Sequence, residues 1–122
     1  MNIRSDVQIS ADDLLDRKLV SGLADTFKIL GDPTRIRILD ALFRAELCVR
    51  DIADLLELTD SAVSHQLRLL RSTGLVRQRR AGQLIFYALD DQHVVRLMAQ
   101  GLQHIEERES GVSSRTALTS AG

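Results

Sequence analysis

The sequence predicts a mainly α-helical domain with a β-hairpin, arranged as a winged helix-turn-helix. Residues 49–57 and 60–73 are each expected to form a short helix, and only Leu58-Thr59 separates them. After Leu75, the stretches LVRQRR and QLIFYAL flank Ala81-Gly82, which indicates two antiparallel strands joined by a tight turn. Further helices are expected before and after these elements. Helices, a helix pair, a hairpin and a last helix follow one another in the order of this fold.

The first helix is expected within residues 11–30. Ser10 followed by Asp13 resembles a capping box, in which side chains bond the free amides of the first turn. Gly31 should end this helix, because glycine suits the left-handed position after a helix. The polar segment 1–10 that precedes it is expected to be flexible.

A second helix begins in GDPTRIRILDALF. Asp32 can cap its first amides, and Pro33 fits the first helical position, where no amide donor is required. The buried stripe of this helix is expected to consist of Ile36, Leu39, Leu42 and Phe43.

The helix pair contains the candidate DNA-binding surface. In its first helix, Ile52, Ala53 and Leu56 lie on one side. In its second helix, at about 100° per residue, the apolar face is formed by Val63, Leu67 and Leu70. The members of the opposite, polar face lie within about 80° of one another: Ser61, Ser64, His65, Arg68 and Ser72. Such groups suit base edges and phosphates in a major groove, although any solvated helix presents polar residues.

Charge is distributed unevenly along the chain. The net charge of −1 by itself disfavours a nucleic-acid binder. Residues 61–89, however, contain five arginines and no acidic residue. Three of these arginines surround the hairpin turn, where a wing could reach the DNA backbone or a minor groove: Arg77, Arg79 and Arg80. A basic segment in an otherwise acidic chain is typical of a protein that turns one face toward phosphate, so we expect double-stranded DNA as a partner.

The remaining features bound the class of protein. A last helix is expected over about residues 91–107, followed by a disordered tail at 108–122, so that the folded domain comprises residues 11–107. No apolar run is long enough to cross a membrane, and the N-terminus lacks the pattern of a signal peptide. Cys48 is the only cysteine, which excludes an internal disulfide and fits a cytoplasmic location. Nothing resembles a nucleophile with a base, so we do not expect an enzyme.

Four stretches resemble the ArsR/SmtB family of metal-sensing repressors: LGDPTRIRILDAL, ELCV, SAVSHQLRLLRSTGLV and GQLIFYALDD. The similarity covers about residues 20–107. It implies a homodimer that binds imperfect inverted repeats in operator DNA and releases them when a metal binds. It also implies that Ser61, Ser64 and His65 face DNA. One departure from the general helix-turn-helix pattern is that the turn Glu57-Leu58-Thr59 has no glycine.

The last helix carries candidate metal ligands. His93 and His104 are eleven residues apart and return to the same stripe, and Glu107 lies within about 40° of His93 on it. Along the axis the two imidazoles are roughly 16 Å apart, whereas a metal–nitrogen bond is about 2 Å. An antiparallel copy of the helix would bring His93 of one chain beside His104 and Glu107 of the other, with Asp91 close to His93. Each dimer would then have two sites of two nitrogens and two carboxylates, which suit tetrahedral zinc.

The resemblance implies the same ligand set. Zinc-sensing members pair an Asp-x-His near the start of this helix with a His-x-x-His/Glu of the other subunit, and Asp91, His93, His104 and Glu107 match in type and spacing. In the family, the histidine matching His104 passes a hydrogen bond to a backbone carbonyl just after the recognition helix, a position that Gly74 occupies here. The apolar face expected at the dimer seam consists of Val94, Leu97, Met98, Gly101 and Ile105.

The sequence leaves open which metal binds and which signal controls DNA binding. Cobalt could replace zinc. Thiophilic ions prefer thiolates, but Arg50 stands where thiolate-sensing relatives have their second cysteine, so we expect Cys48 to be a small buried hydrophobe. Nickel-sensing relatives recruit extra histidines, and none follows His104. Other possibilities are a repressor controlled by Cys48 oxidation, a zinc-buffering or hydrolytic protein, and a constitutive architectural protein.

Overall fold

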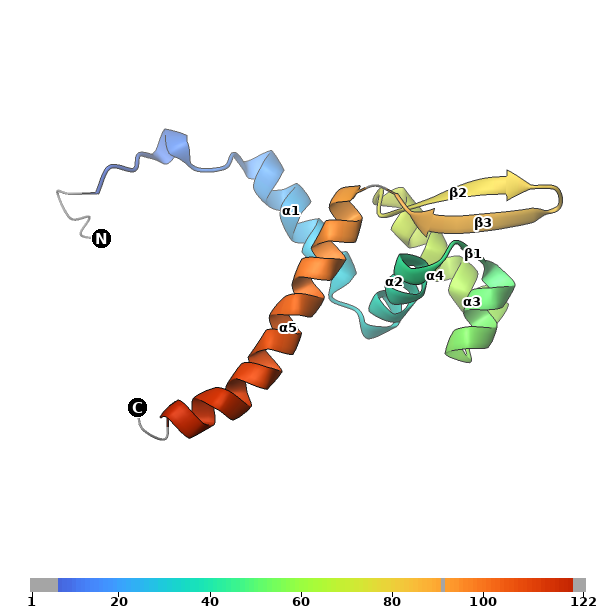
Figure 1. Ribbon diagram of the computed structural model, residues 1–122. Coiled ribbons are helices and arrows are strands. Elements are labelled where there is room, and N and C mark those ends of the chain that lie inside the picture. Colours follow the sequence, from blue (N-terminus) through green and yellow to red (C-terminus); the bar gives the residue numbers. More distant parts are fainter. Residues whose placement is uncertain (1–6, 91, 120–122) are drawn as a thin grey trace.

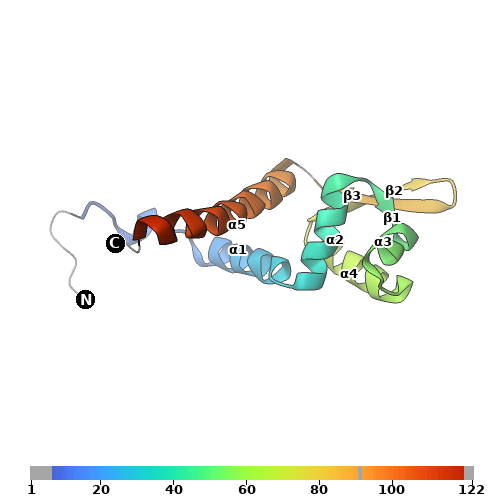
Figure 2. The ribbon, with the colours of Figure 1, turned by 60° about the horizontal axis from the view of Figure 1, so that its bottom comes forward.

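The computed structural model describes residues 7–90 and 92–119, with side chains as far as Gly111. A short 3₁₀ turn at Ala11–Asp13 precedes the main elements, which are α1 (Arg17–Leu30), α2 (Pro33–Arg44), β1 (Leu47–Cys48), α3 (Val49–Leu56), α4 (Asp60–Ser72), β2 (Val76–Ala81), β3 (Leu84–Leu89) and α5 (Gln92–Thr119). We call α2, α3, α4 and the sheet the body, and α1 and α5 the projecting helices, because both extend from the same end of the body (Figure 1, Figure 2). The predicted winged helix-turn-helix is confirmed.

α1 lies within the predicted range 11–30, but it does not begin at the predicted capping box. The expected capping box forms, with the Ser10 amide donating to Asp13 Oδ2 at 2.9 Å, but it closes only the 3₁₀ turn. The helix itself begins at Arg17, because the carboxylate of Asp16 accepts from the Leu19 amide at 2.9 Å and caps it. The predicted end holds, since Gly31 is the C-cap, but its φ of −82° is not left-handed. Its amide instead bonds the Lys28 carbonyl, so the last turn closes without a left-handed residue.

The capping of α2 is confirmed, whereas half of its expected stripe is not. Asp32 Oδ2 accepts from the Arg35 amide at 3.1 Å, and Pro33 occupies the first turn. The buried residues of this helix are Ile38, Leu39 and Leu42. Ile36 and Phe43 are each 38% exposed, because the rest of the body packs against the side of α2 that carries Ile38, Leu39 and Leu42.

The helix pair forms as predicted, within a residue at each end. Val63, Leu67 and Leu70 of α4 are fully buried, and the hydroxyl of Thr59 caps the helix by accepting from the Ala62 amide. Between the helices, Glu57 adopts the left-handed conformation with φ of 57°. The chain thus makes the turn with a residue type that rarely adopts this conformation, where glycine is commonly used.

The sheet contains one strand that the sequence pattern did not reveal. The strand order is β1-β3-β2, all antiparallel, with Cys48 opposite Phe86. The two-residue β1 is too short to show alternation. Because Ala81 pairs with Leu84, the hairpin turn is Gly82-Gln83, one residue later than predicted. Gly82 has φ of 65°, as the first position of a primed hairpin turn requires.

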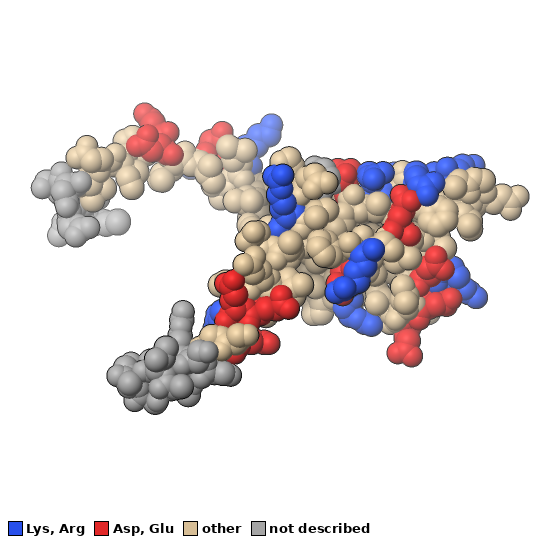
Figure 3. Space-filling view, in the orientation of Figure 1, with Lys and Arg blue, Asp and Glu red and all other residues tan. Residues whose placement is uncertain are grey.

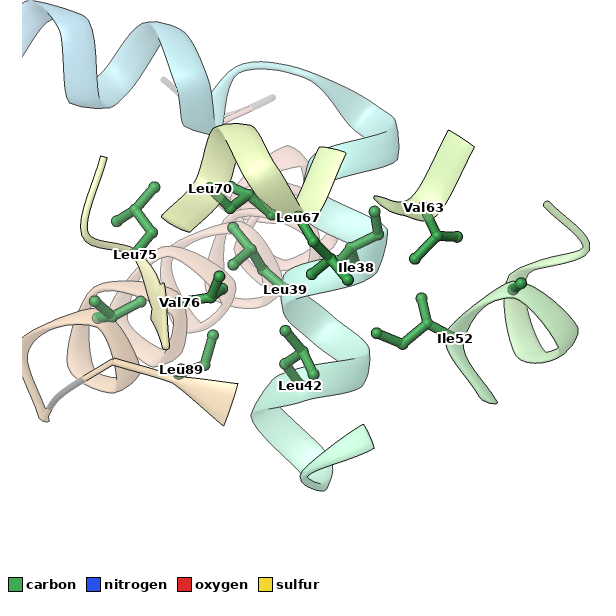
Figure 4. Close-up of a cluster of buried hydrophobic side chains, with 12 residues drawn as sticks. Ile38, Leu39, Leu42, Ile52, Val63, Leu67, Leu70, Leu75, Val76 and Leu89 are labelled. Atoms are coloured by element: carbon green, nitrogen blue, oxygen red, sulfur yellow. The ribbon is translucent and has the colours of Figure 1, made fainter. Parts of the chain in front are cut away.

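The hydrophobic core lies between α2, α3, α4 and the base of the hairpin (Figure 4). The largest fully buried side chains are Ile38, Leu39, Ile52, Val63, Leu67 and Leu70. Leu75, Val76 and Leu89 connect the hairpin to this cluster, and Val94 connects the first turn of α5 to it. The core therefore fixes the helix pair and the hairpin relative to each other.

The last helix is longer than expected. Instead of ending near residue 107, α5 continues to Thr119, into the segment expected to be disordered. Glu106, Glu107, Arg108 and Glu109 are exposed but are mostly good helix formers, which favours a longer helix. Residues 120–122 of that tail and residues 1–6 of the expected flexible N-terminus lie outside the described part of the chain. Among the described helices, none has the length and apolar character needed to span a bilayer.

Candidate nucleic-acid interface and metal ligands

The polar face of α4 is available to a partner. Ser61, His65 and Arg68 are exposed, and Ser64 is half-buried. The fully buried apolar face holds the opposite side of the helix against the body. The hydroxyl of Ser72 donates to the Leu69 carbonyl at 2.8 Å, so its hydrogen serves the helix itself. The four α4 residues predicted to bind DNA thus share one accessible helix face.

The hairpin adds basic groups, but its three arginines are not equivalent. Arginine side chains gather over the hairpin, at the upper right of the space-filling view (Figure 3). Arg77 and Arg80 are exposed. Arg79 is also exposed, but it bonds Glu46 Oε1 through both Nη2, at 2.6 Å, and Nε, at 2.8 Å. Its guanidinium also lies 5.0 Å from the centre of the Phe86 ring. Arg79 is therefore held against the sheet.

In the Glu46–Arg79 ion pair, each side chain favours the charged form of the other. The hydrogen bond from Arg79 lowers the pKa of Glu46 below its ordinary value, and the charges of Arg79 and Arg77 act in the same direction. The same hydrogen bond raises the pKa of Arg79. Both groups are therefore charged at neutral pH. Glu46 was not among the predicted residues, because its position beside Arg79 depends on the pairing of β1 with β3.

Gly74 ends α4 in a conformation that requires glycine. Its φ is 76°, its amide bonds the Arg71 carbonyl, and the Leu75 amide bonds the Leu70 carbonyl, each at 3.0 Å. This pair of bonds is a Schellman motif, in which glycine avoids the penalty that a Cβ would bring. The backbone carbonyl expected to accept the hydrogen bond from His104 thus belongs to the glycine that ends α4.

The candidate metal ligands do not form a site within one chain. His93 lies in the first turn of α5, and His104 and Glu107 lie further along it, with all three side chains exposed. Glu107 Oε1 accepts from Gln103 Nε2 at 2.8 Å. The described residues contain no cluster of three or more His, Cys, Asp or Glu side chains able to hold a metal, and Asp91 lies outside them. Because α5 is one continuous helix, these residues could share one ion only with ligands from a second chain, and that shared site stays a prediction.

Cys48 lies on β1, half-buried and opposite Phe86. A half-buried thiol can pack as a small apolar group. The residue therefore matches its expected packing role only in part, since it is not fully buried.

The projecting helices carry a large uncovered apolar surface. In α1 no residue is buried, and Leu19, Val20, Leu23 and Phe27 are each about half exposed, at 49–57%. On α5, Leu97, Leu102 and Ile105 are also exposed. Val94, in contrast, is only 6% exposed and Met98 packs partly against the core, so these two seam candidates already contact their own chain. Monomeric proteins rarely leave such contiguous apolar surface in water.

Comparisons with known proteins match this arrangement. Residues 32–78 match the family model described as "Bacterial regulatory protein, arsR family". The chain is 46% identical over 87 residues to the transcriptional repressor SmtB homolog of Synechocystis sp., a match that covers 71% of this chain and 66% of that protein. It is 41% identical over 86 residues to a cadmium resistance transcriptional regulatory protein CadC homolog of Staphylococcus aureus, covering 70% of this chain and 71% of that protein.

A solved structure has the same fold. The homodimeric winged helix-turn-helix DNA-binding domain Mb0332 from Mycobacterium bovis superimposes with a TM-score of 0.74 at 32% identity, covering 80% of this chain and 93% of that one. That structure is described as a possible ArsR-family transcriptional regulator. Sequence similarity and three-dimensional similarity thus point to the same group of proteins.

Proposed function

This chain belongs to the arsR family of bacterial regulatory proteins, and on that premise we propose that it is a zinc- or cobalt-responsive repressor that binds operator DNA as a homodimer. Membership places it among DNA-binding transcription regulators, several of which are metal-responsive repressors. The DNA-contacting residues, the homodimer and the metal are inferred from the residues of this chain.

The observation that carries the proposal is the polar face of α4 next to the basic hairpin. Ser61, Ser64, His65 and Arg68 would enter the major groove, where hydroxyl, imidazole and guanidinium groups bond base edges and phosphates. Arg77 and Arg80 are exposed and would contact the DNA backbone beside it. Arg79, held by Glu46, would support the wing and contribute less directly.

A homodimer would cover the apolar surface of the projecting helices. Two copies would also place two α4 helices on an imperfect inverted repeat, whose half-sites are about one helical turn apart. The similar Mycobacterium bovis domain is homodimeric, which supports the same assembly here.

The donor set fits zinc if two copies of α5 meet head to tail. Asp91 and His93 of one chain and His104 and Glu107 of the other would supply two nitrogens and two carboxylates. When bound, zinc would supply only a structural link between subunits, because four protein ligands leave no open position on a tetrahedral ion. Cobalt accepts similar ligands and would substitute.

Release follows if the metal prefers a dimer shape that fits the operator poorly, since an effector acts only through its different affinity for two states. We propose that the distal N–H of the bound His104 bonds the carbonyl of Gly74, at the end of the recognition helix. Because only a backbone carbonyl is needed as the acceptor, a glycine can serve at this position.

A mobility-shift assay with the promoter DNA of its own gene tests the proposal. The protein should retard the duplex, and zinc or cobalt at low free concentration should release it. His104→Ala should still bind DNA but lose metal release, whereas Gln100→Ala, also exposed on α5, should behave like the wild type. Retained release in the His104 variant would exclude the proposed ligand set.

A second candidate input follows from the cadmium-resistance relative and from Cys48. A thiophilic ion, or oxidation of this thiol, could control the same repressor. Under this alternative Cys48→Ser would abolish the response while His104→Ala would preserve it. Nickel, which accepts additional ligands, is distinguished by including it in the same titration.

A further inference from the structure

Two arginines near the start of α2 attach this helix to both members of the helix pair. Arg37 Nη2 donates to the Leu56 carbonyl at the end of α3, at 3.2 Å. Arg35 Nε donates to Gln66 Oε1 on α4 at 2.9 Å. Both Arg35 and Gln66 are half-buried, so water competes less for this bond than at the open surface.

Arg35 also reaches the helix that precedes α2. Its Nη1 donates to the Ile29 carbonyl, in the last turn of α1, at 3.4 Å. The carbonyls of a last helical turn lack partners within the helix and carry partial negative charge, so a guanidinium is a favourable partner there. One rigid, planar group therefore contacts the end of α1 and the middle of α4 at the same time.

The contact to Gln66 constrains α4 differently from its apolar contacts. Val63, Leu67 and Leu70 fix the depth at which α4 is buried, but hydrophobic contacts are not directional. A charge-assisted hydrogen bond is directional and short. Gln66 immediately follows His65, so the bond restrains the rotation of the helix that presents the polar face.

The other end of this connection lies in the projecting helices. Apart from its last residues, which pack against the core, α1 makes little contact with the body, and its apolar side chains are uncovered. A second copy seated on α1 and α5 would therefore set the position of the Ile29 carbonyl. A change at the end of α1 would therefore act on Arg35, which also bonds Gln66 of α4.

We propose that Arg35 is a positioning residue that couples the projecting helices to the recognition helix through Gln66. This inference rests on the proposed function, because it assumes that metal binding alters the contact between two copies. It assigns the connection to a side chain of α2, separate from the carbonyl of Gly74 and from any metal ligand.

The test measures the ratio of operator affinities without and with zinc chloride, by fluorescence anisotropy on the promoter duplex. Arg35→Gln and Gln66→Leu should each lower this ratio about tenfold, the factor for one charge-assisted hydrogen bond. The double variant should lose no more than either single variant. Arg44→Gln removes an equal charge from α2 but only an exposed pair with Asp40, and should keep the wild-type ratio.

Gln66→Glu separates positioning from mere packing. It keeps an acceptor for Arg35 and should restore the ratio, even though its negative charge weakens DNA binding with and without zinc. Equal losses in Gln66→Leu and Gln66→Glu, or a wild-type ratio in both, would overturn the inference. If Arg35→Gln does not fold, as judged by circular dichroism, the two Gln66 variants decide. Wild-type protein that zinc does not release would instead refute the proposed function.

Discussion

The body and the projecting helices differ in how much of their apolar surface is buried within one chain. Six side chains of the body have no or almost no exposed surface, whereas α1 has no buried residue at all. Burial of apolar surface supplies most of the stability of a fold, so the body has what it needs from its own chain. The projecting helices display apolar residues at helical spacing and leave them in water. This difference supports the proposed homodimer, in which a second copy would cover the apolar residues that α1 and α5 leave exposed.

The largest expected effect tests the body. Leu67→Ala should lower the free energy of unfolding by about 2–5 kcal/mol, because it leaves a cavity in a fully buried site. Urea denaturation followed by circular dichroism measures the change. Leu55→Ala, at a 63% exposed position of α3, is the control and should change stability by less than about 0.5 kcal/mol. Similar losses in both variants would show that the core is assigned wrongly.

A substitution in the projecting helices should weaken dimerisation more than it lowers folding stability. Phe27→Glu places a charge in the uncovered apolar surface of α1 and should raise the dimer dissociation constant at least about 30-fold, as expected for an interface anchor. Sedimentation equilibrium measures it. Asp25→Asn, on the other side of the same helix, should leave the dimer intact. A Phe27→Glu protein that dimerises like the wild type would remove the basis for the contrast.

A smaller effect is expected where the body ends α4. Gly74→Ala should cost about 1–2 kcal/mol, because a Cβ at φ of 76° is strained although no atom lies within 4 Å of it. Thermal unfolding measures the cost. Gly101→Ala in α5 has an open surrounding and helical φ, and should stabilise a single helix by up to about 1 kcal/mol. If Gly101→Ala also weakens the dimer, a second chain approaches closely at that residue.

The smallest effect concerns the Glu46–Arg79 pair, which is largely exposed. Because the pKa of Glu46 is lowered in the folded protein, its contribution is present above the ordinary value of 4.5 and is lost as the pH falls through the lowered pKa. Unfolding of the wild type and of Glu46→Gln, compared between pH 7 and pH 3, should therefore differ less at the acidic end. A constant difference would mean that the pair does not contribute through charge.

Much of the body could be predicted from local sequence patterns. The cap at Asp32 and the buried face of α4 depend on residues within one or two turns of one another, and capping preferences and helical periodicity reveal them. The hairpin was also predicted, with its turn displaced by one residue. Capping at Ser10 misled the prediction of α1, because Asp16 provides a competing cap only a few residues later. The length of α5 was underestimated, because charged residues without apolar partners resemble a tail.

The sequence by itself determined the order of the elements, the face of α4 that is polar and the spacing of His93, His104 and Glu107, since these follow from backbone geometry and neighbouring residues. Only the tertiary structure decided that Arg79 is held by Glu46, that Arg35 bonds Gln66, and that Ile36 and Phe43 lie outside the core. The reason is physical. Such contacts join residues far apart in the chain, and their existence depends on strand register and helix packing, which no local pattern of residues encodes.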